Sequence, residues 1–157
     1  MNFSIIVPFY NEEKNVAKLH KEIIRCLERI KNEHKFELIY VDDGSKDKTR
    51  KELKKIKKSF FSHKLIFHKK NHSQSKAIQS GINESIYENL IFLDGDLQND
   101  PSDINKLMSF YIKKKLDMVI GWRKKRQDNI FRIIPSVIAN KIVNLLTKSK
   151  IHDNGCA

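Results

Sequence analysis

The sequence predicts an α/β fold in which a mostly parallel sheet is flanked by helices. Short apolar runs that suit buried strands alternate along the chain with segments whose apolar residues recur at helical spacing. This alternation is typical of parallel sheets, because the crossover between two parallel strands is usually a helix. The chain has 157 residues, enough for one domain with a buried core, and it contains no internal repeat or low-complexity linker.

The first half of the chain supplies two strand–helix pairs. Residues 4–7 form an apolar run that Pro8 ends, which indicates a buried strand. Residues 13–31 carry apolar side chains at helical spacing and predict an amphipathic helix. Residues 36–41 predict a second strand that leads directly into acidic residues, and residues 48–58 predict a basic helix.

The pattern repeats in the second half. Residues 65–67 predict a third strand and residues 75–85 a helix. Residues 90–93 predict a fourth strand, and residues 104–112 keep the apolar spacing of a helix.

Two further elements are expected towards the end of the chain. Residues 117–120 predict a fifth strand. Residues 130–146 predict a helix with a wide apolar face, which suits either core packing or an interfacial helix lying on a membrane.

The charge, the cysteines and the apolar runs of the chain indicate which partners and which compartment to expect. The 31 basic and 19 acidic residues give a net charge of +12, which favours polyanions such as nucleic acid, an anionic membrane or phosphorylated substrates. Neither Cys26 nor Cys156 belongs to a CxxC pair, so a reducing, cytosolic compartment is expected. The N-terminus lacks the pattern of a signal peptide, and no run reaches the roughly 20 apolar residues of a membrane span. We therefore expect a soluble or peripheral protein.

Polar residues follow four of the predicted strands. Ligands of such sheets bind outside the carboxyl ends of the strands, so these residues form the candidate site. They are Pro8, Tyr10, Asn11 and Glu12 after the first strand, Asp42 and Asp43 after the second, Asp94, Asp96 and Gln98 after the fourth, and Arg123 after the fifth.

The acidic pair in the segment FLDGDLQND suggests a metal site. Asp94 and Asp96 are separated only by Gly95, and two carboxylates this close repel each other unless a cation neutralises them. Mg²⁺ is typically held by one or two carboxylates together with substrate phosphates, and Gln98 could add a third oxygen. The alternative is that the two aspartates cap the helix beginning near Pro101.

The second acidic pair allows two interpretations as well. Asp42 or Asp43 could accept hydrogen bonds from a base or ribose, or the Asp-Gly-Ser sequence could simply form a turn. The chain has neither a Walker phosphate loop nor a GxGxxG fingerprint, which argues against a P-loop NTPase or an ordinary NAD enzyme.

Three segments together resemble family 2 glycosyltransferases of the GT-A fold. They are PFYNE at residues 8–12, DDGSKDKT at residues 42–49 and DGDLQ at residues 94–98. Further segments are similar to the polyprenyl-phosphate glycosyltransferases, of the dolichyl-phosphate mannose synthase and undecaprenyl-phosphate sugar transferase type. These are residues 71–74, residues 126–128, Arg132, Ser136, Asn140 and residues 153–156.

The resemblance implies inverting transfer of a sugar from a UDP- or GDP-sugar to a polyprenyl phosphate, with Mg²⁺ or Mn²⁺ as cofactor. Asp94, Asp96 and Gln98 would hold the metal and the diphosphate. Arg132 and Ser136, four residues apart on one helix face, would meet the acceptor phosphate, where Asp153 could assist. The nucleotide and donor phosphates would be held by Pro8, Tyr10, Asn11, Glu12, Asp42, Asp43, Arg123 and Arg126.

The chain departs from the family pattern at two places. Ser73 stands where relatives commonly have glycine, which is a cost if the backbone there needs a positive φ. The chain stops at Ala157, whereas family members usually continue. We therefore expect a single GT-A domain over residues 1–157, with a complete nucleotide-sugar part and a truncated acceptor part.

Other functions remain open at this point. The chain could be an inactive remnant that binds only nucleotide-sugar, or a family 2 transferase acting on a polysaccharide. A basic nucleic-acid-binding protein is a remote alternative, because no nucleic-acid-binding motif is visible and the candidate site is acidic. The expected location is the inner face of the cytoplasmic membrane, where anionic lipids attract basic residues. A homo-oligomer or a separate membrane-domain partner is compatible with this.

Overall fold

The computed structural model describes residues 1–56 and 61–121. The chain divides into two compact units, Met1–Lys106 and Leu107–Ala157. Among the described residues, no helix is both long and apolar enough to cross a membrane.

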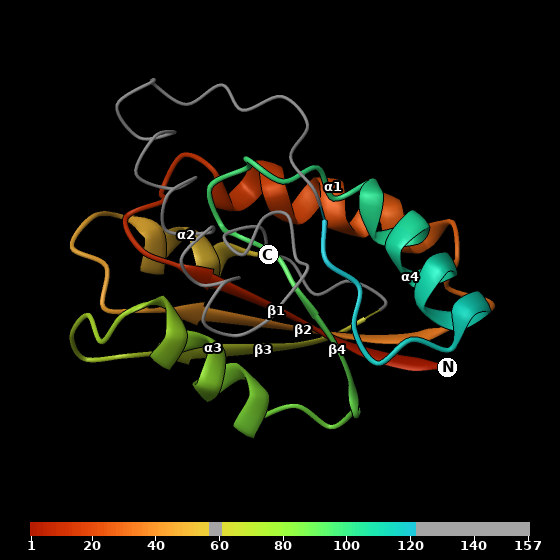
Figure 1. Ribbon diagram of the computed structural model, residues 1–157. Helices are drawn as coiled ribbons and strands as arrows, with labels where there is room; N and C mark the ends of the chain where they lie inside the picture. Colours follow the sequence, from red (N-terminus) through yellow and green to blue (C-terminus); the bar gives the residue numbers. More distant parts are fainter. Residues whose placement is uncertain (57–60, 122–157) are drawn as a thin grey trace, which may run out of the picture. The chain divides into compact units, whose positions relative to one another are not determined.

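The first unit contains a four-stranded sheet in the order β3-β2-β1-β4, in which all paired strands are parallel (Figure 1). This confirms the α/β prediction and the first four predicted strands, although most strands are longer than predicted. Their bounds are Asn2–Phe9 for β1, Lys35–Asp42 for β2, Ser62–Phe67 for β3 and Asn89–Phe92 for β4.

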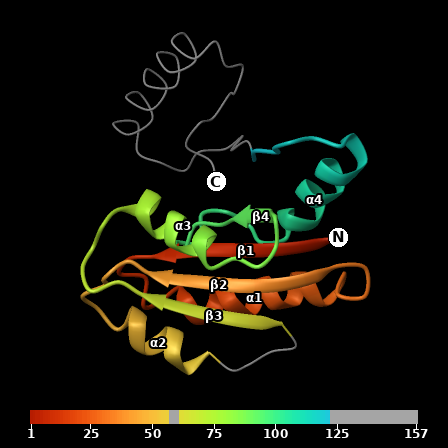
Figure 2. The ribbon, with the colours of Figure 1, turned by 90° about the horizontal axis from the view of Figure 1, so that it is seen from below.

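Three helices of this unit connect the strands and cover both faces of the sheet. Helices α1 and α2 lie on one face and α3 lies on the other (Figure 1), and Figure 2 views the sheet from the α3 side. The four described helices are α1 Val16–Glu28, α2 Thr49–Lys55, α3 Gln74–Asn83 and α4 Asp103–Lys114. All four were predicted, and the first two are shorter than the apolar spacing suggested.

The apolar spacing of the helices explains how they pack. In α1 the fully buried residues Val16, Leu19, Ile23 and Leu27 recur every three or four positions, which gives one continuous apolar stripe. On the opposite face of the sheet, α3 approaches β1 closely at Gly81. A Cβ atom added there would lie 2.4 Å from Ile6 Cγ2, so only glycine fits.

The predicted strand at residues 117–120 is wrong. These residues are described, and they form neither a strand nor a helix. A strand requires a ladder partner, and an apolar run reports a tendency to be buried rather than to pair. Helix α4 ends at Lys114, and Lys115 then adopts a φ of 51°.

Several predictions lie outside the described residues. They are the helix at residues 130–146 and the candidate site residues Arg123, Arg126, Arg132, Ser136 and Asp153.

Candidate functional site

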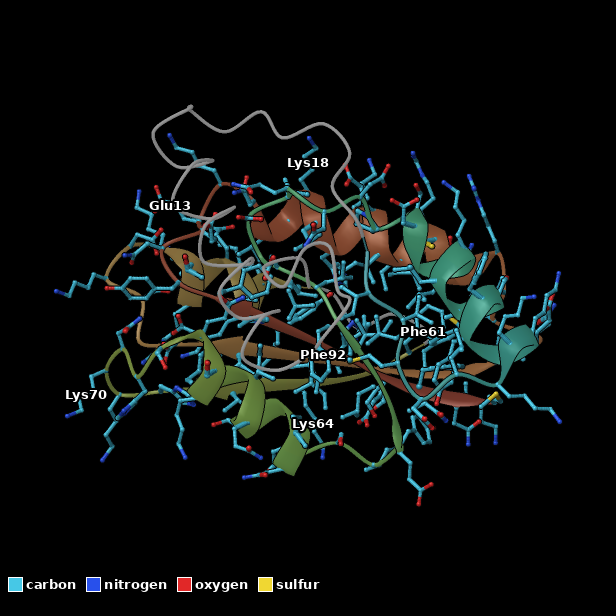
Figure 3. The ribbon with its side chains drawn as sticks, viewed as in Figure 1. Glu13, Lys18, Phe61, Lys64, Lys70 and Phe92 are labelled. Carbon is cyan, nitrogen blue, oxygen red and sulfur yellow. The ribbon has the colours of Figure 1, made fainter. Side chains whose placement is uncertain are left out.

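Because the strands are parallel, their carboxyl ends meet at one edge of the sheet. The loops that follow β1, β2, β3 and β4 all begin there. Figure 3 labels Glu13 in the loop after β1 and Lys70 in the loop after β3, at the same end of the sheet. The sequence therefore correctly placed its candidate residues from β1, β2 and β4 at a common edge.

The loops after β1 and β2 are joined by hydrogen bonds. The backbone N–H of Asn11 donates to Ser45 Oγ at 2.9 Å, and Asn11 Oδ1 accepts from the Lys46 backbone N–H at 2.8 Å. The backbone N–H of Glu12 donates to Thr49 Oγ1 at 2.7 Å. Asn11, which the sequence assigned to the nucleotide, therefore holds these two loops together, with a φ of 57° that asparagine tolerates well.

Asp42 makes hydrogen bonds that hold parts of the fold together. Its side chain is fully buried, and Oδ1 accepts from the Ser45 backbone N–H at 3.0 Å, as the turn interpretation requires. Its Oδ2 accepts from Arg50 Nε at 2.8 Å, and Arg50 Nη2 donates to the His68 carbonyl at 2.5 Å. Asp42 thus anchors α2 and the loop after β3 to the end of β2.

Asp43 organises the loop after β3. Its buried carboxylate accepts from the backbone N–H groups of His72, at 3.0 Å, and Ser73, at 2.9 Å. His68 Nδ1 lies 2.7 Å from Asp43 Oδ1, and His68 Nε2 lies 2.9 Å from Ser80 Oγ. A carboxylate only accepts, so Nδ1 carries a proton; in the neutral imidazole, Nε2 then accepts from the Ser80 hydroxyl.

The backbone of the same loop is strained at Ser73. Its φ of 95° and ψ of 156° lie in a region that is almost exclusive to glycine. The loop therefore does adopt the positive φ that the family glycine would have accommodated. The backbone of Gly44 packs against the same loop. A Cβ atom added at Gly44 would lie 2.2 Å from the carbonyl carbon of Lys70, so a side chain does not fit there.

The segment after β4 is packed tightly against the end of β1. A Cβ atom at Gly95 would lie 2.6 Å from the Pro8 carbonyl oxygen and 2.7 Å from Phe9 Cδ1, so the residue between the two aspartates must be glycine. Consequently the backbone of Gly95 fixes where Asp94 and Asp96 leave the sheet.

Asp94 and Asp96 are held by amide groups. Asp94 Oδ1 accepts from Gln74 Nε2 at 2.7 Å, and Asp94 Oδ2 accepts from Asn99 Nδ2 at 3.0 Å. Asp96 Oδ1 accepts from the backbone N–H of Gln98 at 3.0 Å.

Another aspartate supports the start of α4. Asp100 accepts from the Ser102 backbone N–H at 2.8 Å, and its carbonyl accepts from the Asp103 N–H at 3.0 Å. These contacts give the capping role at the start of α4 to Asp100, whereas the alternative drawn from the sequence gave it to Asp94 and Asp96.

The electrostatics of this edge suit a cation. The pKa of Glu12 is raised by burial and by the negative charges of Asp96 and Asp47, against a lowering by the hydrogen bond from Asn15. Within residues 1–56 and 61–121, no group of three or more His, Cys, Asp or Glu side chains could hold a metal by itself. A pair of carboxylates nevertheless fits Mg²⁺ or Mn²⁺ that is shared with substrate phosphates.

The structure places the remaining candidates at the same edge. Tyr10 is 41% exposed beyond β1, and Gln98 is exposed beside Asp96. Sequence reasoning gave no role to the residues that hold the aspartates, namely Arg50, His68, Gln74 and Asn99. Only Gln74 had a signal, because it belongs to the segment at residues 71–74 that matched the family pattern.

Comparisons with known proteins find relatives along nearly the whole chain. The model of the family described as glycosyl transferase family 2 matches residues 4–156. A dodecaprenyl-phosphate galacturonate synthase from Rhizobium johnstonii is 36% identical over 159 residues, covering 100% of this chain and 46% of the relative. An undecaprenyl-phosphate 4-deoxy-4-formamido-L-arabinose transferase from Proteus mirabilis is 34% identical over 154 residues, covering 98% of this chain and 46% of the relative. The chain thus spans about half the length of these curated relatives.

Solved structures share the fold. S. aureus TarS 1-349 in complex with UDP-GlcNAc superimposes with a TM-score of 0.62 at 22% identity, over 82% of this chain and 37% of that one. The mannosyltransferase PcManGT from Pyrobaculum calidifontis, in complex with GDP-Man and Mn²⁺, gives a TM-score of 0.58 at 17% identity, over 84% of this chain and 38% of that one. The fold is that of the GT-A glycosyltransferases, and because the family match runs through nearly the whole sequence, the chain belongs to glycosyl transferase family 2.

Proposed function

We propose that this chain contains the donor-binding and metal-binding part of a polyprenyl-phosphate glycosyltransferase. The reaction would transfer one sugar from a nucleotide-sugar to the phosphate of a polyprenyl lipid. The observation that carries the proposal is the pair Asp94 and Asp96, fixed by Gly95 at the carboxyl edge of the sheet and close to Glu12. Two curated relatives are a dodecaprenyl-phosphate galacturonate synthase and an undecaprenyl-phosphate 4-deoxy-4-formamido-L-arabinose transferase, which supports a lipid-phosphate acceptor.

The chemistry requires charge compensation more than proton transfer. An oxygen of the lipid phosphate attacks the anomeric carbon, and the bond from that carbon to the nucleoside diphosphate breaks with its electron pair leaving on the diphosphate. A single displacement of this kind inverts the anomeric centre. A phosphate monoester has a second pKa of about 6, so the attacking oxygen is mostly ionised near neutrality without a general base.

Asp94 and Asp96, with Gln98 beside them, would hold Mg²⁺ or Mn²⁺. The bound cation would neutralise the charge that develops on the diphosphate leaving group. The amide groups that hold Asp94 would keep its carboxylate oriented before the donor binds.

The nucleotide would bind beside this pair. Tyr10 is exposed at the end of β1 and could lie against a base, while Glu12 and Asp43 border the same edge. Since Asp43 already accepts from two backbone N–H groups, we expect it to shape the pocket through the loop after β3 as well as through direct contact.

The acceptor side is proposed from the resemblance alone. Arg132, Ser136 and Asp153 would face the lipid phosphate, with Arg123 and Arg126 near the donor phosphates. Planar guanidinium groups suit this task because they bind phosphate oxygens in pairs. The net charge of +12 would favour the anionic inner face of the cytoplasmic membrane.

Calorimetric titration tests the donor site directly. The purified chain would be titrated with UDP, GDP and their sugars in the presence of Mn²⁺ and then of EDTA. We expect one nucleotide to bind more tightly with Mn²⁺ than with EDTA. This enhancement should be lost in Asp96→Asn and kept in Asp103→Asn, an exposed aspartate paired with Lys106 on α4. A lipid-phosphate transfer assay with the nucleotide-sugar so identified would follow.

Two other outcomes would count against the proposal. A folded chain that binds no nucleotide would refute the donor site. A chain that binds a nucleotide-sugar but transfers nothing to a polyprenyl phosphate would favour the nucleotide-binding remnant.

A further inference from the structure

We propose that Gln74 is a positioning residue for the metal site, and that it fixes the Asp94 carboxylate through its side-chain amide. This inference rests on the proposed function, since it assumes that Asp94 binds the cation of the donor complex. Gln74 is the first residue of α3, so the proposal links the loop after β3 to the segment after β4.

Both oxygens of the Asp94 carboxylate accept a hydrogen bond from a side-chain amide. One oxygen accepts from Gln74 at 2.7 Å and the other accepts from Asn99 at 3.0 Å. A carboxylate oxygen has two lone pairs, so in general it can accept a hydrogen bond and bind a cation at the same time. The two amides come from different segments, and together they restrict rotation of the carboxylate about its Cβ–Cγ bond.

The position of Gln74 is set by the residues that precede it in the chain. The preceding residues His72 and Ser73 donate their backbone N–H groups to the buried carboxylate of Asp43. The Ser73 carbonyl then accepts from the backbone N–H of Ala77 at 3.1 Å, which closes the first turn of α3. The start of the helix is therefore anchored to the end of β2, and Gln74 projects from an anchored backbone.

A second glutamine on the same helix behaves differently. Gln79 Nε2 donates to Asn83 Oδ1 at 2.8 Å, a contact one turn away along the helix surface. Gln74 instead reaches a residue twenty positions away, at the candidate metal site. Both glutamines are exposed, so burial does not explain the contact that Gln74 makes.

These contacts connect the part of the site expected to bind the base with the part expected to bind the metal. Asp43, which borders the expected base pocket, holds the loop from which Gln74 reaches Asp94. Partners that orient a metal ligand typically contribute about 10- to 100-fold to metal affinity. Loss of the Gln74 amide should thus lower the affinity of the site for the cation. The contacts between the protein and the base should stay unchanged.

The test compares two matched substitutions in the 157-residue chain. Gln74→Met keeps the length of the side chain and removes its N–H donors, and Gln79→Met makes the same change five residues further along α3. The measurements are the Mn²⁺ dissociation constant, taken with saturating UDP or GDP, and the dissociation constant of the same nucleotide in EDTA. Circular dichroism and thermal unfolding establish that each variant is folded.

We expect Gln74→Met to bind Mn²⁺ about 10-fold more weakly than the wild type, with nucleotide binding in EDTA unchanged. Gln79→Met should match the wild type in both measurements. Gln74→Asn retains an amide that is one methylene too short to reach Asp94, so it should reproduce the loss and serves as a second variant if Gln74→Met does not fold.

Three results would overturn the inference. The first is an unchanged Mn²⁺ dissociation constant in a folded Gln74 variant, which would leave the proposed function standing. The second is an equal loss in Gln79→Met, or an equal loss of nucleotide binding in EDTA, since either would indicate a general effect on α3. The third is a wild-type chain whose nucleotide binding does not respond to Mn²⁺, which would remove the proposed function together with this inference.

Discussion

Replacing Ser73 with glycine should stabilise the protein. At φ 95° and ψ 156°, Ser73 occupies a region that costs a residue with a Cβ atom about 1–3 kcal/mol. Glycine removes this strain but increases the conformational entropy of the unfolded chain, which costs about 0.4–1 kcal/mol. The net gain in the free energy of unfolding should be about 1 kcal/mol, because the backbone groups of Ser73 keep their partners on Asp43 and in α3.

Urea unfolding of the wild type and Ser73→Gly, followed by far-UV circular dichroism, measures this difference. For a chain of this size, a gain of 1 kcal/mol corresponds to a rise in Tm of about 2–4 °C. Ser73→Ala is the matched control, because it removes the hydroxyl and keeps the Cβ atom, so it should give no comparable gain. If Ser73→Gly were no more stable than the wild type, the strain would not exist in solution and the reasoning would be wrong.

Two further predictions concern the packing behind the acidic pair and the core beneath it. Gly95→Ala should lower the free energy of unfolding by about 1–3 kcal/mol and abolish Mn²⁺-dependent nucleotide binding, because the new methyl would lie 2.6 Å from the Pro8 carbonyl oxygen. Calorimetry and urea unfolding check this, and unchanged values would contradict it. Burial and the nearby His63 lower the pKa of His20 to about 4, so its contribution to stability is complete above pH 6.5 and is lost as the pH falls towards 4. Between pH 6.5 and 4, the free energy of unfolding of the wild type should fall by about 2 kcal/mol more than that of His20→Gln, a value that allows for solvent screening of the half-buried ring. Urea unfolding at several pH values measures this difference. Equal falls in the two proteins would refute the assignment.

The sequence determined the order of the elements because its periodic patterns are local. Apolar positions at helical spacing gave α1, and the apolar run before Asp42 and Asp43 gave β2, within a few residues of the observed bounds. The same reasoning failed at residues 117–120, where an apolar run has no ladder partner among the described residues.

The general position of the site also followed from the sequence. Parallel strands end at one edge, so acidic residues that follow β2 and β4 had to lie near each other. The family pattern of residues 71–74 likewise pointed to a backbone at Ser73 that suits glycine, as the observed φ of 95° bears out.

Only the tertiary structure decided what each carboxylate does. Asp42 and Asp43 are neighbours in the sequence, yet one binds Arg50 and supports a turn, while the other holds backbone groups about thirty residues away. Similarly, the reach of Gln74 to Asp94 depends on how α3 is anchored to the sheet. Spacing along a chain reports which residues are buried or share a face, whereas hydrogen-bond partners depend on distances between segments that meet only after folding.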